Sequence, residues 1–161
     1  MGIVLARIDN RLLHGIVATQ WAPTSGCTRL MVIDDGVAAD QLAKESMKLA
    51  RPVGMALSVI SEETAIGNFK AKKYGDQKIF VVVKSPSTLL KLLEIGENIP
   101  KIIIGGTVTI PDGIVLSNRA MASKEDVEVY KKIAKYHVPM KIQYVPADRE
   151  TSLSAIVDLD H

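Results

Sequence analysis

His14 is the side chain with the clearest capacity for chemistry, because an imidazole with an unprotonated ring nitrogen is a nucleophile. It stands in the segment ARIDNRLLHGIVATQW, residues 6–21. Arg11, three residues earlier, carries a permanently charged, forked guanidinium that suits phosphate oxygens. Gly15, directly after the histidine, has no side chain to clash with a group held on the ring. Together these residues indicate a phosphoryl acceptor site that needs no metal.

A helix is expected to begin near His14. Its first free backbone N–H groups would be those of Gly15, Ile16 and Val17. Such groups bind anions, and the helix dipole adds about half a positive charge. We therefore expect these three amides to bind the phosphoryl group. Trp21, near the end of the segment, is expected to fill the core, with anchoring of a partner as the alternative.

Two further charged residues lie in the same segment. Arg7 is expected on the same exposed face, where it would supply a second positive charge. Asp9 is expected either to hold Arg11 or to fix one imidazole tautomer through a hydrogen bond. The alternative is structural, because a lone histidine near a helix start is more often structural or simply exposed than catalytic. Neighbouring Arg and Asp side chains usually form a solvated ion pair.

The elements that position these residues are expected to alternate between strand and helix. Several apolar runs are nearly continuous, which suits strands covered on both faces. These runs are residues 3–8, 30–33, 56–60, 79–83, 102–104, 114–116 and 142–145. Helical periodicity marks residues 39–51, 62–73, 86–95 and 124–136. The alternation predicts a mainly parallel sheet in a three-layer α/β/α arrangement, with His14 exposed at the edge where the carboxyl ends of the strands meet.

Local signals support these boundaries. Ser61, Ser85 and Ser123 are each expected to cap the N-terminus of a helix. Residues 105–118 are expected to form an extended loop with a short strand. The tail after Pro146 is expected to end as a short helix or to fray.

Composition limits the class of protein. The 161 residues carry a net charge of +2 and a single cysteine. The length favours one domain, residues 1–161, and the charge argues against nucleic-acid binding. One cysteine supplies neither an internal disulfide nor a Cys-based zinc site, and no stretch reaches the roughly 20 apolar residues of a membrane span. We expect a cytoplasmic protein without cofactor or metal that reaches the membrane only through a partner.

The order Arg-Ile-Asp-x-Arg-Leu-Leu-His-Gly, which begins at Arg7, resembles the active loop of the mannose/fructose/sorbose family of IIB components of bacterial sugar phosphotransferase systems. In that family the loop reads Arg-Ile-Asp-x-Arg-Leu-Ile-His-Gly-Gln-Val. The resemblance continues through residues 32–35, 52–55 and 104–106. It implies an open, mainly parallel sheet of about seven strands with helices on both faces.

The resemblance also implies a protein-phosphohistidine–sugar phosphotransferase. His14 would accept a phosphoryl group from a IIA component on its delta nitrogen, with Arg11 in contact with the group, and pass it to a sugar presented by membrane IIC and IID components. Asp35 and Gly106 are expected to support the site. A homo-oligomer is compatible with this family, and the sugar stays open among mannose, fructose, sorbose and amino sugars. The family's glutamine two residues after the histidine is replaced by Ile16, which keeps a backbone N–H but loses any side-chain hydrogen bond.

Two other functions are compatible with parts of the sequence. Asp34, Asp35 and Lys84 are similar to the acidic pair and the lysine of a magnesium-dependent phosphoaspartate receiver. A receiver also needs an acceptor aspartate after its third strand, but the third apolar run ends at residues 60–61, Ile-Ser. Gly105 and Gly106 would suit a small nucleotide-binding protein. However, no Gly-x-Gly-x-x-Gly or Walker lysine motif follows the first strand, and architecture alone assigns no function.

Overall fold

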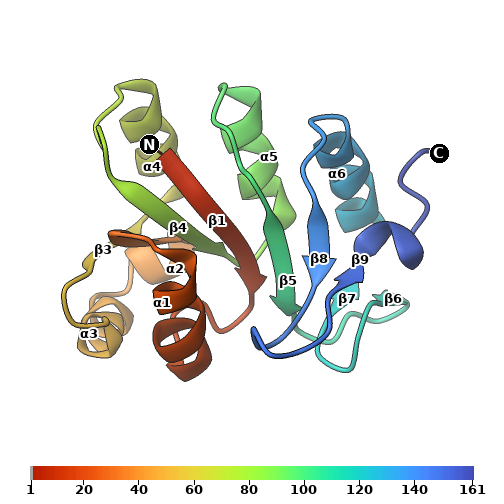
Figure 1. The fold of residues 1–161 in the computed structure, drawn as a ribbon, viewed down its shortest axis with the longest axis horizontal. Helices are drawn as coiled ribbons and strands as arrows, with labels where there is room; N and C mark the ends of the chain where they lie inside the picture. The colour runs from red at the N-terminus through yellow and green to blue at the C-terminus, as the bar shows by residue number, and fades with distance from the viewer. Residues whose placement is uncertain (1) are drawn as a thin grey trace.

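The structure is a computed structural model that describes residues 2–161. The strands of its main sheet are β1 (Gly2–Asp9), β2 (Arg29–Ile33), β3 (Ala56–Ile60), β4 (Lys78–Val83), β5 (Ile102–Gly106), β8 (Met140–Ile142) and β9 (Thr151–Ser152). They lie in the order β3-β2-β4-β1-β5-β8-β9 (Figure 1). All neighbours pair in parallel except β9, which is antiparallel to β8. The predicted mainly parallel, seven-stranded sheet is confirmed.

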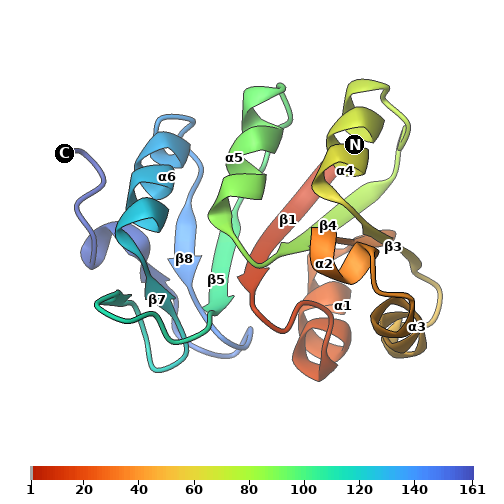
Figure 2. The same cartoon turned by 180° about the vertical axis from the view of Figure 1, so that it is seen from behind.

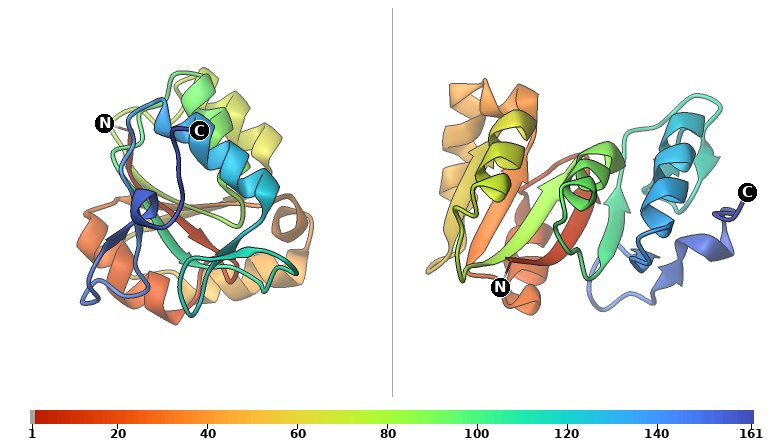
Figure 3. Two further views of the ribbon diagram at one scale, coloured as in Figure 1. Left: turned by 90° about the vertical axis from the view of Figure 1, so that its right-hand side faces the viewer. Right: turned by 90° about the horizontal axis from the view of Figure 1, so that it is seen from above.

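Helices cover both faces of this sheet. They are α2 (Asp35–Ala38), α3 (Gln41–Ala50), α4 (Glu62–Lys70), α5 (Pro86–Glu94), α6 (Lys124–Ala134) and the 3-10 turn η2 (Leu153–Ala155). Between β1 and β2, residues 15–25 are helical and include the π-helical η1 (Val17–Trp21) and α1 (Ala22–Ser25). α4, α5 and α6 lie over the face that is turned to the viewer in Figure 2, and α1 lies over the opposite face (Figures 1 and 3). The predicted three-layer architecture is therefore confirmed.

Burial on both faces explains the continuous apolar runs. In β4, Ile79, Val81 and Val83 belong to the core cluster beneath α4, α5 and α6. The residues between them, Phe80 and Val82, belong to the cluster beneath η1 and α1. Because successive side chains of a strand point to opposite faces, a strand buried on both sides must be apolar throughout.

The predicted helix caps are also present. The hydroxyl of Ser61 accepts from the N–H of Thr64 at 3.1 Å, and that of Ser85 accepts from the N–H of Ser87 at 3.2 Å. Ser123 forms a reciprocal capping box with Asp126. Each cap satisfies backbone donors that a helix cannot pair internally, and each contributes about 1 kcal/mol.

The C-terminal third departs from expectation. The strand predicted at residues 142–145 forms earlier, as β8, and ends at Ile142. The carbonyls of the next two residues accept hydrogen bonds from Arg7 instead of pairing in the sheet. The predicted strand at residues 114–116 forms as β6 (Ile114–Val115), but it pairs with β7 (Met121–Ala122) outside the main sheet. β9 takes the seventh place. Within residues 2–161, every helix is too short or too polar to cross a bilayer.

Candidate functional site

Two leucines fix the loop that follows β1. Leu12 and Leu13 are 1% and 6% exposed and pack into the core cluster beneath residues 15–25. Leu12 has a φ of 55°, a left-handed conformation that few residues other than glycine adopt. Its N–H donates to the carbonyl of Asp9 at 3.1 Å. The chain thus turns back sharply after β1 and brings His14 to the start of the helix.

Asp9 orients the imidazole. Its Oδ2 lies 2.8 Å from Nε2 of His14, and its Oδ1 accepts from the backbone N–H of Arg11 at 2.9 Å. Of the two expected contacts of Asp9, the hydrogen bond to the imidazole is present. Its contact with Arg11 is to the backbone N–H and not to the guanidinium. An ionised carboxylate only accepts hydrogen bonds, so this geometry favours the tautomer with the proton on Nε2. Nδ1 then carries the free lone pair.

The His14 ring is less exposed than expected. Its side chain is only 8% exposed, because the bond to a carboxylate that is itself 2% exposed draws the ring inward. Nδ1, however, makes no hydrogen bond to any residue in the described part of the chain. No side-chain nitrogen or oxygen buried in that part lacks a partner, so Nδ1 must reach solvent. The expectation of an exposed ring is wrong, although Nδ1 reaches solvent.

Arg7 lies behind this pair and not beside the phosphoryl group. It is fully buried, and its Nε donates to Oδ2 of Asp9 at 3.1 Å. Its other nitrogens donate to the carbonyls of Gln143 at 3.1 Å and Tyr144 at 2.9 Å. Its Cζ lies 5.0 Å from the ring centroid of Trp21. Burial lowers the pKa of Arg7, and the charge of Asp9 opposes that shift.

The expectation of Arg7 on the exposed face is therefore wrong. In β1 it stands between Ala6 and Ile8, both fully buried, in a strand covered on both sides. It supports the site by holding Asp9 in place. Trp21 fills the core, as expected, and donates from Nε1 to the carbonyl of Tyr144 at 2.8 Å.

The two glycines that end β5 have different roles. A Cβ at Gly105 would overlap Nη2 and Cζ of Arg7 and lie 2.7 Å from its Nε, so the absence of a side chain there makes room for the guanidinium. Sequence reasoning chose Gly106, whose carbonyl accepts from the N–H of Asn10 at 3.1 Å. The sequence did contain a signal for the role of Gly105. Arg7 lies within an apolar strand, and a buried arginine there needs space on a neighbouring strand, which a residue without a side chain provides.

The helix after His14 begins as expected. The N–H of Ala18 donates to the carbonyl of His14 at 2.9 Å, which is the first helical hydrogen bond. The N–H groups of Gly15, Ile16 and Val17 precede that bond and have no backbone acceptor within residues 2–161. A Cβ at Gly15 would meet nothing within 4 Å, so open space lies beside the first amide. These groups have the arrangement that binds phosphate at helix N-termini.

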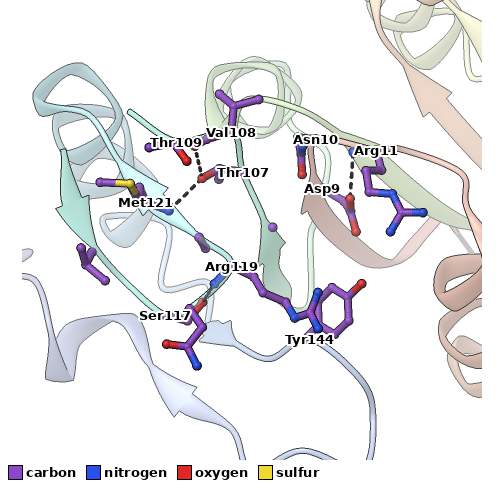
Figure 4. A pocket seen from close by; sticks show the side chains of 14 residues that line it. Asp9, Asn10, Arg11, Thr107, Val108, Thr109, Ser117, Arg119, Met121 and Tyr144 are labelled. Carbon is purple, nitrogen blue, oxygen red and sulfur yellow. Dashed lines mark hydrogen bonds between the residues drawn. The ribbon is translucent and has the colours of Figure 1, made fainter. Parts of the chain in front are cut away.

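A cleft of about 470 Å³ adjoins this loop (Figure 4). It opens at the carboxyl ends of the neighbouring strands β1 and β5. From β1 the chain continues toward β2 in one half of the sheet, and from β5 it continues toward β8 in the other half. Arg11 lines it from the His14 loop, together with Gly106. On the other side Arg119 stacks on Tyr144, with its Cζ 3.7 Å from the ring centroid. Sequence reasoning missed Arg119, because its stacking partner is remote in sequence and no motif surrounds it.

Asp35 does not join this group. Its Oδ1 accepts from the N–H of Glu62 at the start of α4, at 2.9 Å. It follows β2, and β4 lies between β2 and β1, so the expectation that Asp35 supports the His14 site is wrong. Its neighbour Asp34 caps α2 and lies 3.7 Å from Nζ of Lys84. No set of three or more His, Cys, Asp or Glu side chains in residues 2–161 is arranged to hold a metal ion.

Fold and site together define a three-layer α/β protein with a histidine after the first strand. Residues 3–161 match the family model described as the PTS system sorbose subfamily IIB component. The chain therefore belongs to this family of IIB components of sugar phosphotransferase systems.

Relatives agree along almost the whole chain. It is 28% identical over 153 residues to the sorbose-specific EIIB component of Klebsiella pneumoniae, which covers 95% of this chain and 93% of that protein. It is 32% identical over 152 residues to the N-acetylgalactosamine-specific phosphotransferase enzyme IIB component 1 of Escherichia coli K12, covering 94% and 96%. The crystal structure of the IIBSor domain of the Klebsiella pneumoniae sorbose permease superposes with a TM-score of 0.90 at 27% identity, over 100% of this chain and 99% of that one. These comparisons support neither a receiver nor a nucleotide-binding protein.

Proposed function

We propose that the chain is a phosphocarrier in which His14 accepts a phosphoryl group from the phosphohistidine of a IIA component. The group then passes to a sugar presented by membrane IIC and IID components. The observation that carries the proposal is the Asp9 to His14 contact, which binds Nε2 and leaves Nδ1 free and accessible. We place this activity in one cytoplasmic domain, residues 1–161, that meets the membrane only through its partners.

The first half-reaction is an in-line displacement at phosphorus. The lone pair on Nδ1 of His14 forms the new N–P bond while the N–P bond to the donor imidazole breaks. Negative charge spreads over three equatorial oxygens in the transition state. Arg11 and the amides of Gly15, Ile16 and Val17 stabilise that charge without a metal ion. In the second half-reaction a sugar hydroxyl attacks phosphorus and releases its proton to solvent, while the N–P bond to His14 breaks and its electron pair returns to Nδ1.

Asp9 and Arg7 act behind the reacting atom. Once Nδ1 carries the phosphoryl group, Nε2 keeps its proton and the bond to Asp9, which stabilises positive charge on the ring. Arg7 fixes the orientation of the carboxylate through the hydrogen bond from its Nε. Both are positioning residues, because neither touches the transferred group.

The relatives support the choice of partner and substrate class. The mannose-specific EIIAB component of Escherichia coli K12 is 27% identical over 157 residues, and this chain spans 49% of its length. A protein named for both components supports IIA as the phosphoryl donor. The relatives named above are specific for sorbose, mannose and N-acetylgalactosamine, so we propose a hexose or a hexose derivative as acceptor.

Phosphorylation followed by mass spectrometry tests the proposal. The chain is incubated with phosphoenolpyruvate, the general phosphotransferase proteins and a matching IIA component. We expect an acid-labile, alkali-stable phosphate on His14, none in His14→Gln, and a roughly hundredfold slower reaction in Arg11→Gln. Arg51→Gln removes the same charge from an exposed residue at the end of α3 and is expected to react normally. Phosphate on another residue, or an alkali-labile acyl phosphate, would contradict the proposal.

A further inference from the structure

The cleft beside the His14 loop carries uncompensated positive charge. Arg11 and Arg119 both line it, both are exposed, and neither guanidinium has an ion-pair partner in the described part of the chain. Asp9 is the one carboxylate among the described residues that line the cleft, and its charge is met by the buried Arg7. Each guanidinium therefore keeps donors free for an anionic ligand of the cleft.

Arg119 is held ready to bind. Its guanidinium lies flat on Tyr144 (Figure 4), and the carbonyl of Tyr144 is fixed by hydrogen bonds from Arg7 and Trp21 at 2.9 and 2.8 Å. Its own carbonyl accepts from the N–H of Thr107 at 2.9 Å. An arginine that is already ordered loses little conformational entropy when a ligand binds. Arg7, which holds Asp9, thus also fixes the stacking platform of Arg119, together with Trp21.

The rest of the lining suits a polyol. Asn10, Thr109 and Asn118 present amide and hydroxyl groups that make no side-chain hydrogen bond to any other residue of the 2–161 range. Such groups both donate and accept, as sugar hydroxyls require of a binding site. The volume of about 470 Å³ lies within the range of small-molecule sites and exceeds what a lone phosphate ion fills.

Building on the proposed phosphotransfer, we propose that this cleft binds the sugar phosphate that the transfer forms. Arg119, with Arg11, binds the phosphate, while Asn10, Thr109 and Asn118 bind hydroxyls of the sugar. The product is thus held against Asp9 and Arg11, which belong to the His14 loop, although His14 itself does not line the cleft. Binding involves no covalent step and needs no other component.

Calorimetric titration of the unphosphorylated chain tests this directly. The probes are mannose 6-phosphate, N-acetylgalactosamine 6-phosphate, the two free sugars and inorganic phosphate. We expect at least one hexose phosphate to bind about tenfold or more tightly than its free sugar and than inorganic phosphate. Arg119→Gln is expected to weaken that binding about tenfold or more, Arg119→Lys less, and Arg51→Gln not at all.

The outcomes separate this inference from the proposed function. Equal binding of inorganic phosphate and hexose phosphates overturns it, because the cleft is then a simple anion site. No binding by any hexose phosphate, or full binding by a folded Arg119→Gln chain, also overturns it. If His14 fails to take phosphate while Arg119-dependent binding of a hexose phosphate persists, the phosphocarrier proposal fails and the binding site stands.

Discussion

The substitution Gly105→Ala tests whether the buried guanidinium of Arg7 needs the space beside Gly105. A Cβ at this position overlaps the guanidinium of Arg7, which is fully buried and bonded to Asp9, Gln143 and Tyr144. The guanidinium cannot move aside without losing these bonds. Breaking a buried ion pair costs about 3–5 kcal/mol. For a chain of this length, that free energy corresponds to a fall in melting temperature of roughly 6–20 °C.

Gly106→Ala is the matched control. Its Cβ would lie 3.3 Å from Oδ1 of Asn10 and 3.6 Å from the carbonyl of Arg119, contacts that small shifts relieve. We expect a change in unfolding free energy within about 1 kcal/mol. Urea unfolding followed by circular dichroism compares the two variants with the parent chain.

Phosphorylation of His14 gives the second measurement. When Arg7 is displaced, Asp9 loses its partner, so Gly105→Ala is also expected to accept phosphate more slowly under conditions where it remains folded. A Gly105→Ala chain as stable and as reactive as Gly106→Ala would refute the reasoning, because Arg7 would then have another low-energy position.

Three further predictions concern residues around and away from the site. Asp9→Ala leaves the charge of Arg7 buried without its carboxylate and is expected to lower the unfolding free energy by about 3–5 kcal/mol, measured by urea denaturation. Ser123→Ala removes the capping box with Asp126 and is expected to cost about 1 kcal/mol in the same assay; an unchanged midpoint would mean that another group caps α6. Burial raises the pKa of Tyr130, so the folded chain keeps the phenol proton after the unfolded chain loses it near pH 10. The parent chain should therefore lose stability relative to Tyr130→Phe as pH rises above about 10, and equal pH profiles from pH 9 to 11 would contradict this.

Local signals made much of the fold predictable. Ser61, Ser85 and Ser123 cap helices through bonds to residues two or three positions ahead, which a sequence displays directly. Strands such as residues 79–83 are apolar throughout because both faces are buried, and their position was predicted to within one residue. The loop that follows β1 was predictable from its motif, and so was the placement of His14 at the start of a helix.

Long-range contacts account for what was not predicted. Arg7 was expected at the surface, since its hydrogen-bond partners other than Asp9 lie more than 130 positions away. The strand expected at residues 142–145 is apolar enough to pair, but the carbonyls of Gln143 and Tyr144 are taken by that arginine. Arg119 was overlooked because its stacking on Tyr144 exists only in the folded chain. Each of these errors concerns a residue whose contacts are made with parts of the chain that are remote from it in sequence.

The bonds from Arg7 to Gln143 and Tyr144 join residues 136 and 137 positions apart, and they bear on the order of events during synthesis. The ribosome releases the first strand and the His14 loop well before the carbonyls of Gln143 and Tyr144 that anchor Arg7. Contacts of such wide separation form late in folding. A nascent chain that has not yet reached Gln143 therefore lacks the contacts that hold Arg7 beside Asp9, and Asp9 in turn bonds to His14.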